Sequence, residues 1–233
     1  ITVASSNITL YAKWEANKYD VIYELDGGTN NLANPTKYTY GVGVTSFEEP
    51  TKTGYTFQGW YDTTTFDNEI TDISTTQLGA VTLYAKWEET DYDVIYELDG
   101  GDNHTSNPST YTYGVGVTSF EEATKEGHTF KGWHDSAACD NEVTDISNTK
   151  TGAVTLYAKW EVNNYTINYH LDGGNNSNNN PSSYTYGVGV TSFEEATREG
   201  YTFLGWYDSA LIAGTLVTDI SDTSIGEVNL YAK

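Results

Sequence analysis

The sequence predicts an α+β, strand-dominated fold, built as three tandem copies of one small module. The string Leu-Tyr-Ala-Lys begins at Leu10, Leu83, Leu156 and Leu230, at spacings of 73, 73 and 74 residues. Apolar and polar residues alternate with a period of two through much of each copy, as in half-buried strands. One short segment in each copy has instead the capping pattern of a helix. A fixed period of this kind is typical of a modular array.

The repeats are placed at 18–87 (repeat 1), 91–160 (repeat 2) and 164–233 (repeat 3), and 1–14 is interpreted as the C-terminal tail of a preceding copy. Short polar segments without Gly or Pro join the repeats. Such segments differ from the Gly/Ser-rich linkers that let domains move freely. Because the chain has no Met and begins inside a repeat, we expect it to be part of a longer protein.

Four strands are predicted in each repeat. In repeat 1 the first begins at Tyr19, and the others cover about 37–44, 56–62 and 81–88. The first strand has an apolar face made of Tyr19, Val21, Tyr23 and Leu25. Its other face is expected to be wet, since it carries Asn168 in repeat 3. The expected core anchors are Trp60, Trp133 and Trp206.

A short helix is predicted after the second strand. In repeat 1 Ser46 is the expected N-cap, and Glu49 has the spacing that completes a capping box. In repeat 2 the helix is expected to begin at Ser119 and to end at Gly127, about two turns later. Pro50 limits the helix of repeat 1 to one turn. The sequence therefore predicts a four-stranded mixed sheet with one short helix covering one face.

The composition disfavours several classes of partner and fold. The 33 acidic and 11 basic residues give a formal net charge of −22, which disfavours nucleic acids and anionic membranes as partners. The one cysteine, Cys139, forms no intrachain disulfide. No apolar run is long enough to insert into a membrane, and no signal-peptide pattern begins the chain. With 20 Tyr and 6 Trp, several small aromatic cores fit better than one large core.

Two motifs of each copy together resemble a known repeat. Gly54–Asp62 reads Gly-Tyr-Thr-Phe-x-Gly-Trp-Tyr-Asp, and Thr82–Trp87 reads Thr-Leu-Tyr-Ala-Lys-Trp about 20 residues later. This pairing resembles the Listeria–Bacteroides repeat, the class that includes the B-repeat of internalin B. The same pairing recurs at Gly127–Asp135 with Thr155–Trp160 and at Gly200–Asp208 with Asn229–Lys233.

The resemblance implies tandem β-grasp-like modules arranged as an elongated rod, in an extracellular protein that is secreted or held on a bacterial cell surface. It brings no catalytic residue with it. The departures from the motif are His128 and His134, which replace tyrosines, and one extra residue near Ala210–Gly214. The chain also stops at Lys233, before the tryptophan that the motif leads us to expect.

The histidines are the first catalytic candidates, and none keeps a fixed Ser, Cys or carboxylate partner across the repeats. They are His104, His128, His134 and His170. We expect them at the surface or at the boundary of a core. Cys139 takes the place of Phe66 and is expected to be a half-buried structural thiol, because the adjoining Asp140 disfavours a thiolate. Gly41 and Gly43 lack the third glycine and the strand-to-helix turn of a phosphate-binding loop.

The loop after the first strand is the best metal candidate. In repeat 2 it carries Asp99, Asp102 and Asn103, but without the spacing and closing Glu of a calcium loop. We expect a turn with exposed acids, little or no binding of divalent cations, and no cofactor. Paired tyrosines on the second strand could anchor a ligand or pack in a core or between repeats. They are Tyr38 with Tyr40, Tyr111 with Tyr113, and Tyr184 with Tyr186.

Two functions stay open from the sequence. The favoured one is a non-catalytic stalk or spacer, monomeric within a larger surface protein, which projects other domains from a bacterium. The alternative is an adhesion module that engages a host protein or a glycan through its repeated tyrosines or acidic loops. The sequence does not identify the residues of such a binding site, and no convergent set of side chains indicates an enzyme.

Overall fold

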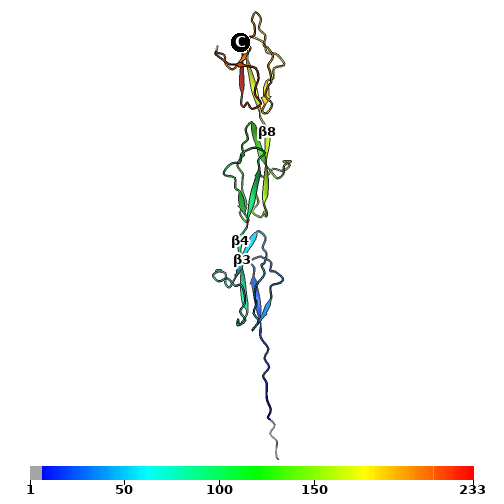
Figure 1. Cartoon of the computed structure of the whole chain (residues 1–233), viewed down its shortest axis with the longest axis vertical. Coiled ribbons are helices and arrows are strands. Elements are labelled where there is room, and N and C mark those ends of the chain that lie inside the picture. The colour runs from blue at the N-terminus through cyan, green and yellow to red at the C-terminus, as the bar shows by residue number, and fades with distance from the viewer. Residues whose placement is uncertain (1–6, 212) are drawn as a thin grey trace, which may run out of the picture. The chain divides into compact units, whose positions relative to one another are not determined.

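The computed structural model describes residues 7–211 and 213–233. Repeat 1 folds into sheet 1, whose strands are β1 (Lys18–Glu24), β2 (Lys37–Thr39), β3 (Tyr55–Tyr61) and β4 (Val81–Glu89). Their order in the sheet is β2-β1-β4-β3, and Figure 1 labels the antiparallel neighbours β3 and β4. β1 pairs antiparallel with β2 and parallel with β4, while β3 pairs antiparallel with β4. The first and last strands of the repeat therefore lie side by side at the centre of the sheet.

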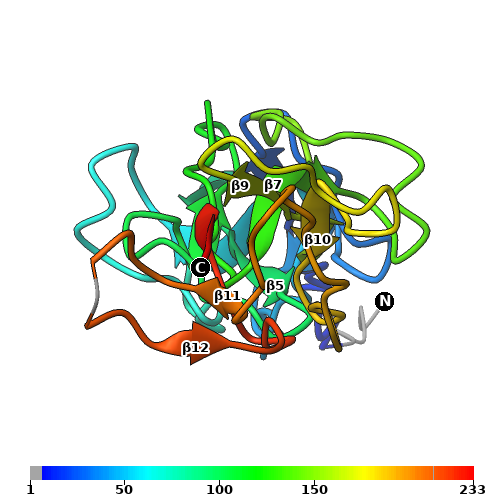
Figure 2. The same ribbon diagram turned by 90° about the horizontal axis from the view of Figure 1, so that it is seen from above.

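Repeats 2 and 3 have the same topology. Sheet 2 has the order β6-β5-β8-β7, from β5 (Asp91–Glu97), β6 (Thr110–Thr112), β7 (His128–His134) and β8 (Val154–Val162). Sheet 3 has the order β10-β9-β13-β11-β12, from β9 (Asn164–His170), β10 (Ser183–Thr185), β11 (Trp206–Tyr207), β12 (Leu216–Val217) and β13 (Val228–Ala232). The added strand β12 pairs antiparallel with β11, and Figure 2 shows the two beside each other at the edge of the sheet.

The chain divides into two compact units. The first comprises the residues up to Tyr92 together with Thr112–Gly116 and Asn148–Gly152, and the second comprises Asp93–Tyr111, Val117–Ser147 and Ala153–Lys233. Sheet 1 lies in the first unit, while most of sheet 2 and all of sheet 3 lie in the second. Two short stretches of repeat 2 therefore pack as part of the first unit.

The predicted helices are absent from the described residues, so the α+β assignment is wrong and the fold is all-β (Figure 1). The side chain of Asn34 forms hydrogen bonds with backbone groups that would be bonded within a helix. Glu48 N–H donates to Asn34 Oδ1 at 2.7 Å, and Asn34 Nδ2 donates to Glu48 O at 2.9 Å. Asn107 and Asn180 hold the backbone of Glu121 and Glu194 in the same way. A helix of one or two turns is marginal in isolation, so these bonds decide the conformation. The prediction of a β-grasp-like module with a helix on its sheet is wrong for the same reason.

The core of each sheet follows the predicted alternation on the first strand. Val21 is buried in β1, whereas its neighbour Ile22 is 44% exposed. On the last strand Leu83 and its counterparts Leu156 and Leu230 are fully buried. Burying a leucine side chain contributes about 1.5–3 kcal/mol relative to leaving it in water. The period-two pattern therefore identified the inward face correctly.

The three predicted tryptophan anchors are confirmed as core residues, each 3% exposed. The Trp133 ring meets Tyr96 and Phe130 edge to face, at centroid distances of 5.0 and 5.2 Å. Its indole N–H donates to Glu121 O at 3.0 Å. The same oxygen also accepts a hydrogen bond from Asn107 Nδ2. Repeat 1 differs, because the buried Trp60 N–H has no hydrogen-bond partner within the described chain.

The segment 1–14, predicted to be the tail of a preceding repeat, lies partly outside the described residues, which begin at residue 7. Residues 7–14 form no strand, and the side chains of Leu10, Tyr11 and Trp14 are about 90% exposed. The same string at Leu83 is the centre of a core. The string therefore becomes a strand only where a first strand and a third strand flank it, since β-propensity is mainly a packing preference.

Within the described residues, no helix is long and apolar enough to cross a membrane.

We predict that Trp133→Ala lowers the free energy of unfolding of repeat 2 by about 3–5 kcal/mol, because it removes a buried aromatic ring and leaves a cavity. Denaturant unfolding followed by far-UV circular dichroism measures this change. Ile95→Ala is the matched control in the same sheet, because Ile95 is 45% exposed. Equal effects of the two substitutions would show that Trp133 is not an anchor.

Candidate binding surface

The four histidines do not form a site. His104 and His170 are exposed and His128 is half-buried, but His134 is 5% exposed, so the prediction of a surface or boundary position is wrong for His134. His134 ends β7, where it pairs with Tyr157 of β8 on one side and forms an isolated β-bridge with Glu142 on the other. Its Nδ1 lies 3.2 Å from Gly132 O.

The partners of the other histidines are local. His104 Nδ1 accepts the Ser106 N–H at 3.2 Å, and the His170 ring stacks on Tyr231 at 4.2 Å. Among the residues that the structure describes, no three His, Cys, Asp or Glu side chains are grouped so that they could hold a metal ion.

Cys139 is a free, half-buried thiol in the loop between β7 and β8. Its φ of +54° matches the +56° of Phe66 in repeat 1, so the two occupy equivalent positions in the loop. The thiol Sγ lies 3.9 Å from Ala137 O. A reactive cysteine needs an electropositive neighbour, and this uncharged carbonyl oxygen does not provide one.

The Gly41-x-Gly43 loop does not offer amides to a phosphate. Gly41 N–H donates to Thr75 O at 2.8 Å, and Gly43 N–H donates to Thr39 O at 3.1 Å. A Cβ on Gly43 would collide with the backbone oxygen of Ile73. The glycines therefore serve a tight turn, since glycine alone adopts positive φ there without strain.

Each acidic loop has one carboxylate paired with a basic side chain. Lys125 Nζ lies 3.1 Å from Asp99 Oδ2, and its counterparts in the other repeats are Lys52 with Asp26 and Arg198 with Asp172. Asn103 Oδ1 accepts a hydrogen bond from Asn107 at 2.7 Å. Asp99 and Asn103, two of the three oxygen donors considered in repeat 2, thus have partners elsewhere in the repeat.

The first tyrosine of each predicted pair belongs to the core. Tyr38 is buried, its ring lies 5.5 Å from that of Tyr19, and its hydroxyl donates to Gly79 O at 2.6 Å. Burial, followed by the nearby Tyr19, raises the pKa of Tyr38 above the usual tyrosine value. Tyr184 repeats the arrangement against Tyr165. These rings do not form an aromatic ladder for a ligand.

The second tyrosine packs against a glycine of another repeat. In the first compact unit, Tyr113 covers Gly54 so closely that a Cβ on Gly54 would lie less than 3.0 Å from its ring. The same ring meets Tyr55 edge to face at 5.5 Å. In the second unit, Tyr186 covers Gly127 in the same manner and meets His128 at 5.7 Å.

Backbone hydrogen bonds surround this contact. Thr90 N–H donates to Gly54 O at 3.0 Å, and Tyr113 N–H donates to Thr90 O at 3.0 Å. In the second unit Asn163 makes the equivalent bonds with Gly127 and Tyr186, at 2.9 and 3.0 Å. The one residue between consecutive central strands is therefore bonded on both sides.

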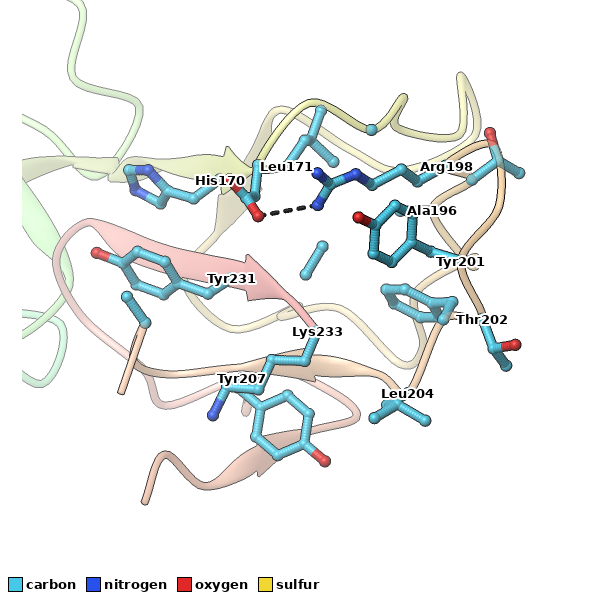
Figure 3. A pocket seen from close by; sticks show the side chains of 16 residues that line it. His170, Leu171, Ala196, Arg198, Tyr201, Thr202, Leu204, Tyr207, Tyr231 and Lys233 are labelled. Carbon is cyan, nitrogen blue, oxygen red and sulfur yellow. Dashed lines mark hydrogen bonds and ion pairs between the residues drawn. The ribbon is translucent and has the colours of Figure 1, made fainter. Parts of the chain in front are cut away.

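Repeat 3 has a cavity of about 750 Å³ where the other repeats have a tryptophan ring. Arg198 lies over Tyr201 at 4.1 Å and pairs with Asp172, and His170, Tyr207 and Lys233 lie around the opening (Figure 3). In repeats 1 and 2 the rings of Trp87 and Trp160 lie against Gly28 and Gly101, the counterparts of Gly174. Repeat 1 has a smaller pocket of about 500 Å³ at the equivalent place, and its lining includes Trp87. The larger cavity of repeat 3 therefore lies where repeat 1 has the tryptophan ring.

The glycine–tyrosine contact was not predicted as a functional feature, although Gly54 begins the Gly-Tyr-Thr-Phe motif of repeat 1. The available sequence signal was a glycine followed by an aromatic residue, and the structure shows that this glycine has a φ of +77°. The tyrosine was considered only as one of several alternatives, because period-two patterning shows which residues share a face but not what covers that face.

Three sheets of one topology, joined by repeated glycine–tyrosine contacts, define a tandem β-repeat protein. The sequence pattern of the Listeria-Bacteroides repeat domain matches residues 19–86, 92–159 and 165–233. The chain belongs to this family, as its motifs led us to expect, in three tandem copies. Repeats of this family occur in bacterial surface proteins such as internalins.

Several curated proteins are similar to the chain. One named "Putative membrane protein" from Evansella cellulosilytica is 36% identical over 217 residues, which cover 88% of this chain and 31% of that protein. A "Putative Gly-rich membrane protein" of the same organism is 35% identical, covering 89% and 23%. Internalin H of Listeria monocytogenes is 30% identical, covering 72% and 29%. The chain thus spans less than a third of each of these relatives.

Gly127→Ala and Gly200→Ala form a matched pair that tests the contact. The two glycines hold the same place in the motif, with φ of +68° and +78°, so alanine costs about 1–2 kcal/mol of backbone strain at either. At Gly127 the new Cβ also meets the Tyr186 ring, whereas nothing lies within 4 Å at Gly200. Urea unfolding should show a larger loss of stability for Gly127→Ala. Equal losses would mean that the tyrosine packing is not a constraint.

Proposed function

We propose that the chain is a non-catalytic, extracellular spacer of a bacterial surface protein, which holds other domains of that protein away from the cell. The family and the similarity to Internalin H support a place among surface proteins. The histidines, the cysteine and the acidic loops considered for chemistry are dispersed or engaged in local contacts, which favours a passive role over catalysis.

The observation that carries the proposal is the hydrogen-bonded linker residue. A flexible linker would leave its backbone to water, but Thr90 and Asn163 each donate to a glycine carbonyl and accept from a tyrosine amide. Thr56 and Thr129 add side-chain hydrogen bonds, to Thr90 at 3.1 Å and to Asn163 at 2.6 Å. A spacer transmits position only if its joints resist bending, and these bonds supply that resistance.

The charge supports the same role. A net charge of −22 on 233 residues makes segments of the chain repel each other and keeps it soluble. Local bases such as Lys52 and Lys125 neutralise acids at the turns, while most other acids stay exposed. Such repulsion opposes collapse of the repeats onto one another, which a spacer must avoid.

Small-angle scattering on the chain tests the proposal. A single globule of this length would have a radius of gyration of roughly 17–18 Å. Three separately folded repeats held apart by stiff joints should instead give roughly 25–28 Å, with the mass of a monomer by light scattering. A short Gly-Ser insertion after Thr90 is the control and should broaden the distance distribution. A radius of gyration below about 20 Å for the unaltered chain would contradict the spacer role.

A further inference from the structure

The first and last strands of each repeat are parallel neighbours. In repeat 1 the register of β1 and β4 runs from Val21 opposite Val81 to Glu24 opposite Tyr84. β5 and β8 pair in the same way in repeat 2, and β9 and β13 do so in repeat 3. The chain therefore enters and leaves every repeat through one central, parallel pair of strands.

This arrangement fixes how tension along the chain would act. The chain enters the pair at Lys18, the start of β1, and leaves it at Glu89, the end of β4. In a parallel pair these points are opposite ends, so tension slides one strand along the other. The evenly spaced bonds of a parallel ladder are then loaded together. A pair opened from one end would break its bonds one after another.

One face of the paired segment is buried. Leu83 is fully buried and lies opposite Tyr23, whose ring is 5.0 Å from that of Trp60. Burial raises the pKa of Tyr23 to about 12. Water competes for backbone hydrogen bonds, so exclusion of water makes each bond harder to exchange while it is under load.

Neighbouring strands hold the pair from both sides. β2 covers the outer edge of β1 between Lys18 and Asp20, and β3 covers the outer edge of β4 from Tyr84 to Glu89. Neither member of the pair is an edge strand, so sliding must also disturb a second ladder.

Tension would pass from one pair directly to the next. β4 ends at Glu89 and β5 begins at Asp91, so only Thr90 separates them. Between β8 and β9 the only intervening residue is Asn163. Neither connection contains a slack segment that could absorb extension.

We propose that each repeat is a tension-bearing module, in which the parallel pair of first and last strands acts as a shear clamp when the chain is pulled from its ends. This function goes beyond that of a spacer, because a spacer need not resist pulling. It rests on strand topology and stands whether or not the spacer proposal does, since scattering tests the one and pulling tests the other.

The single cysteine allows the test in the unaltered sequence. β7 is antiparallel to β8, so its C-terminal end, His134, lies opposite Tyr157 near the start of β8. Cys139 follows in the adjoining loop. Force applied through a handle on Cys139 therefore acts at the C-terminal end of β7. It breaks the hydrogen bonds between β7 and β8 one after another, whereas terminal handles load the β5–β8 pair in shear.

The experiment is single-molecule pulling at one loading rate, with handles at both termini or at the N-terminus and Cys139. Terminal handles should give three unfolding events, each freeing a segment whose fully extended length is roughly 250 Å at about 3.5 Å per residue. With the Cys139 handle, repeat 1 remains in shear as an internal reference. Repeat 2 then gives a shorter event, because its segment up to Cys139 has a fully extended length of roughly 170 Å.

The forces decide the outcome. We expect repeat 1 to unfold at the same force in both geometries. Repeat 2, pulled through Cys139, should open at a force at least about twofold lower than the events seen with terminal handles, because its bonds are loaded in succession. If the short event of repeat 2 needs as much force as repeat 1, the shear clamp is wrong. The proposal also fails if terminal pulling opens the repeats at the low force.

Discussion

The parallel pairing of the first and last strands is the interaction on which each repeat depends. It brings together segments about 60 residues apart in sequence, as in the pairing of Val21 with Val81. It buries Leu83 at the centre of the sheet, in the same core cluster as Trp60. Without it β1 retains only the short β2, and β4 retains only β3.

Much of this arrangement could be predicted from the sequence. The wrong prediction, a short helix in each repeat, has a definite cause. Alternation identified Val21 as an inward residue of the first strand, because a strand places successive side chains on opposite faces. The capping signal at Ser119–Glu122 was real as a pattern, but Asn107 supplies hydrogen bonds to Glu121 that compete with a helix. A side chain 14 residues away in sequence cannot be recognised from local spacing. Tertiary contacts therefore overrode a weak local preference.

The candidate residues show the same limit. Sequence reasoning singled out the paired tyrosines with several alternatives open, and it did not distinguish Tyr111, which is buried, from Tyr113, which covers a glycine. It also placed His134 too near the surface. Which of two alternating residues meets another part of the chain depends on the path of the loops, and period-two patterning carries no information about that path. The glycine–tyrosine contact and the bonded linker residue emerged only from coordinates.

Amide hydrogen exchange on the native chain tests the central claim most directly. If the parallel pair holds each repeat together, the amides within Val21–Glu24 and Val81–Tyr84 should belong to the last group to exchange, with their counterparts in repeats 2 and 3, because the most stable elements open only with global unfolding. The short strands β2, β6 and β10 should exchange earlier. Slowest exchange in those short strands, with early exchange in the parallel pairs, would contradict the account.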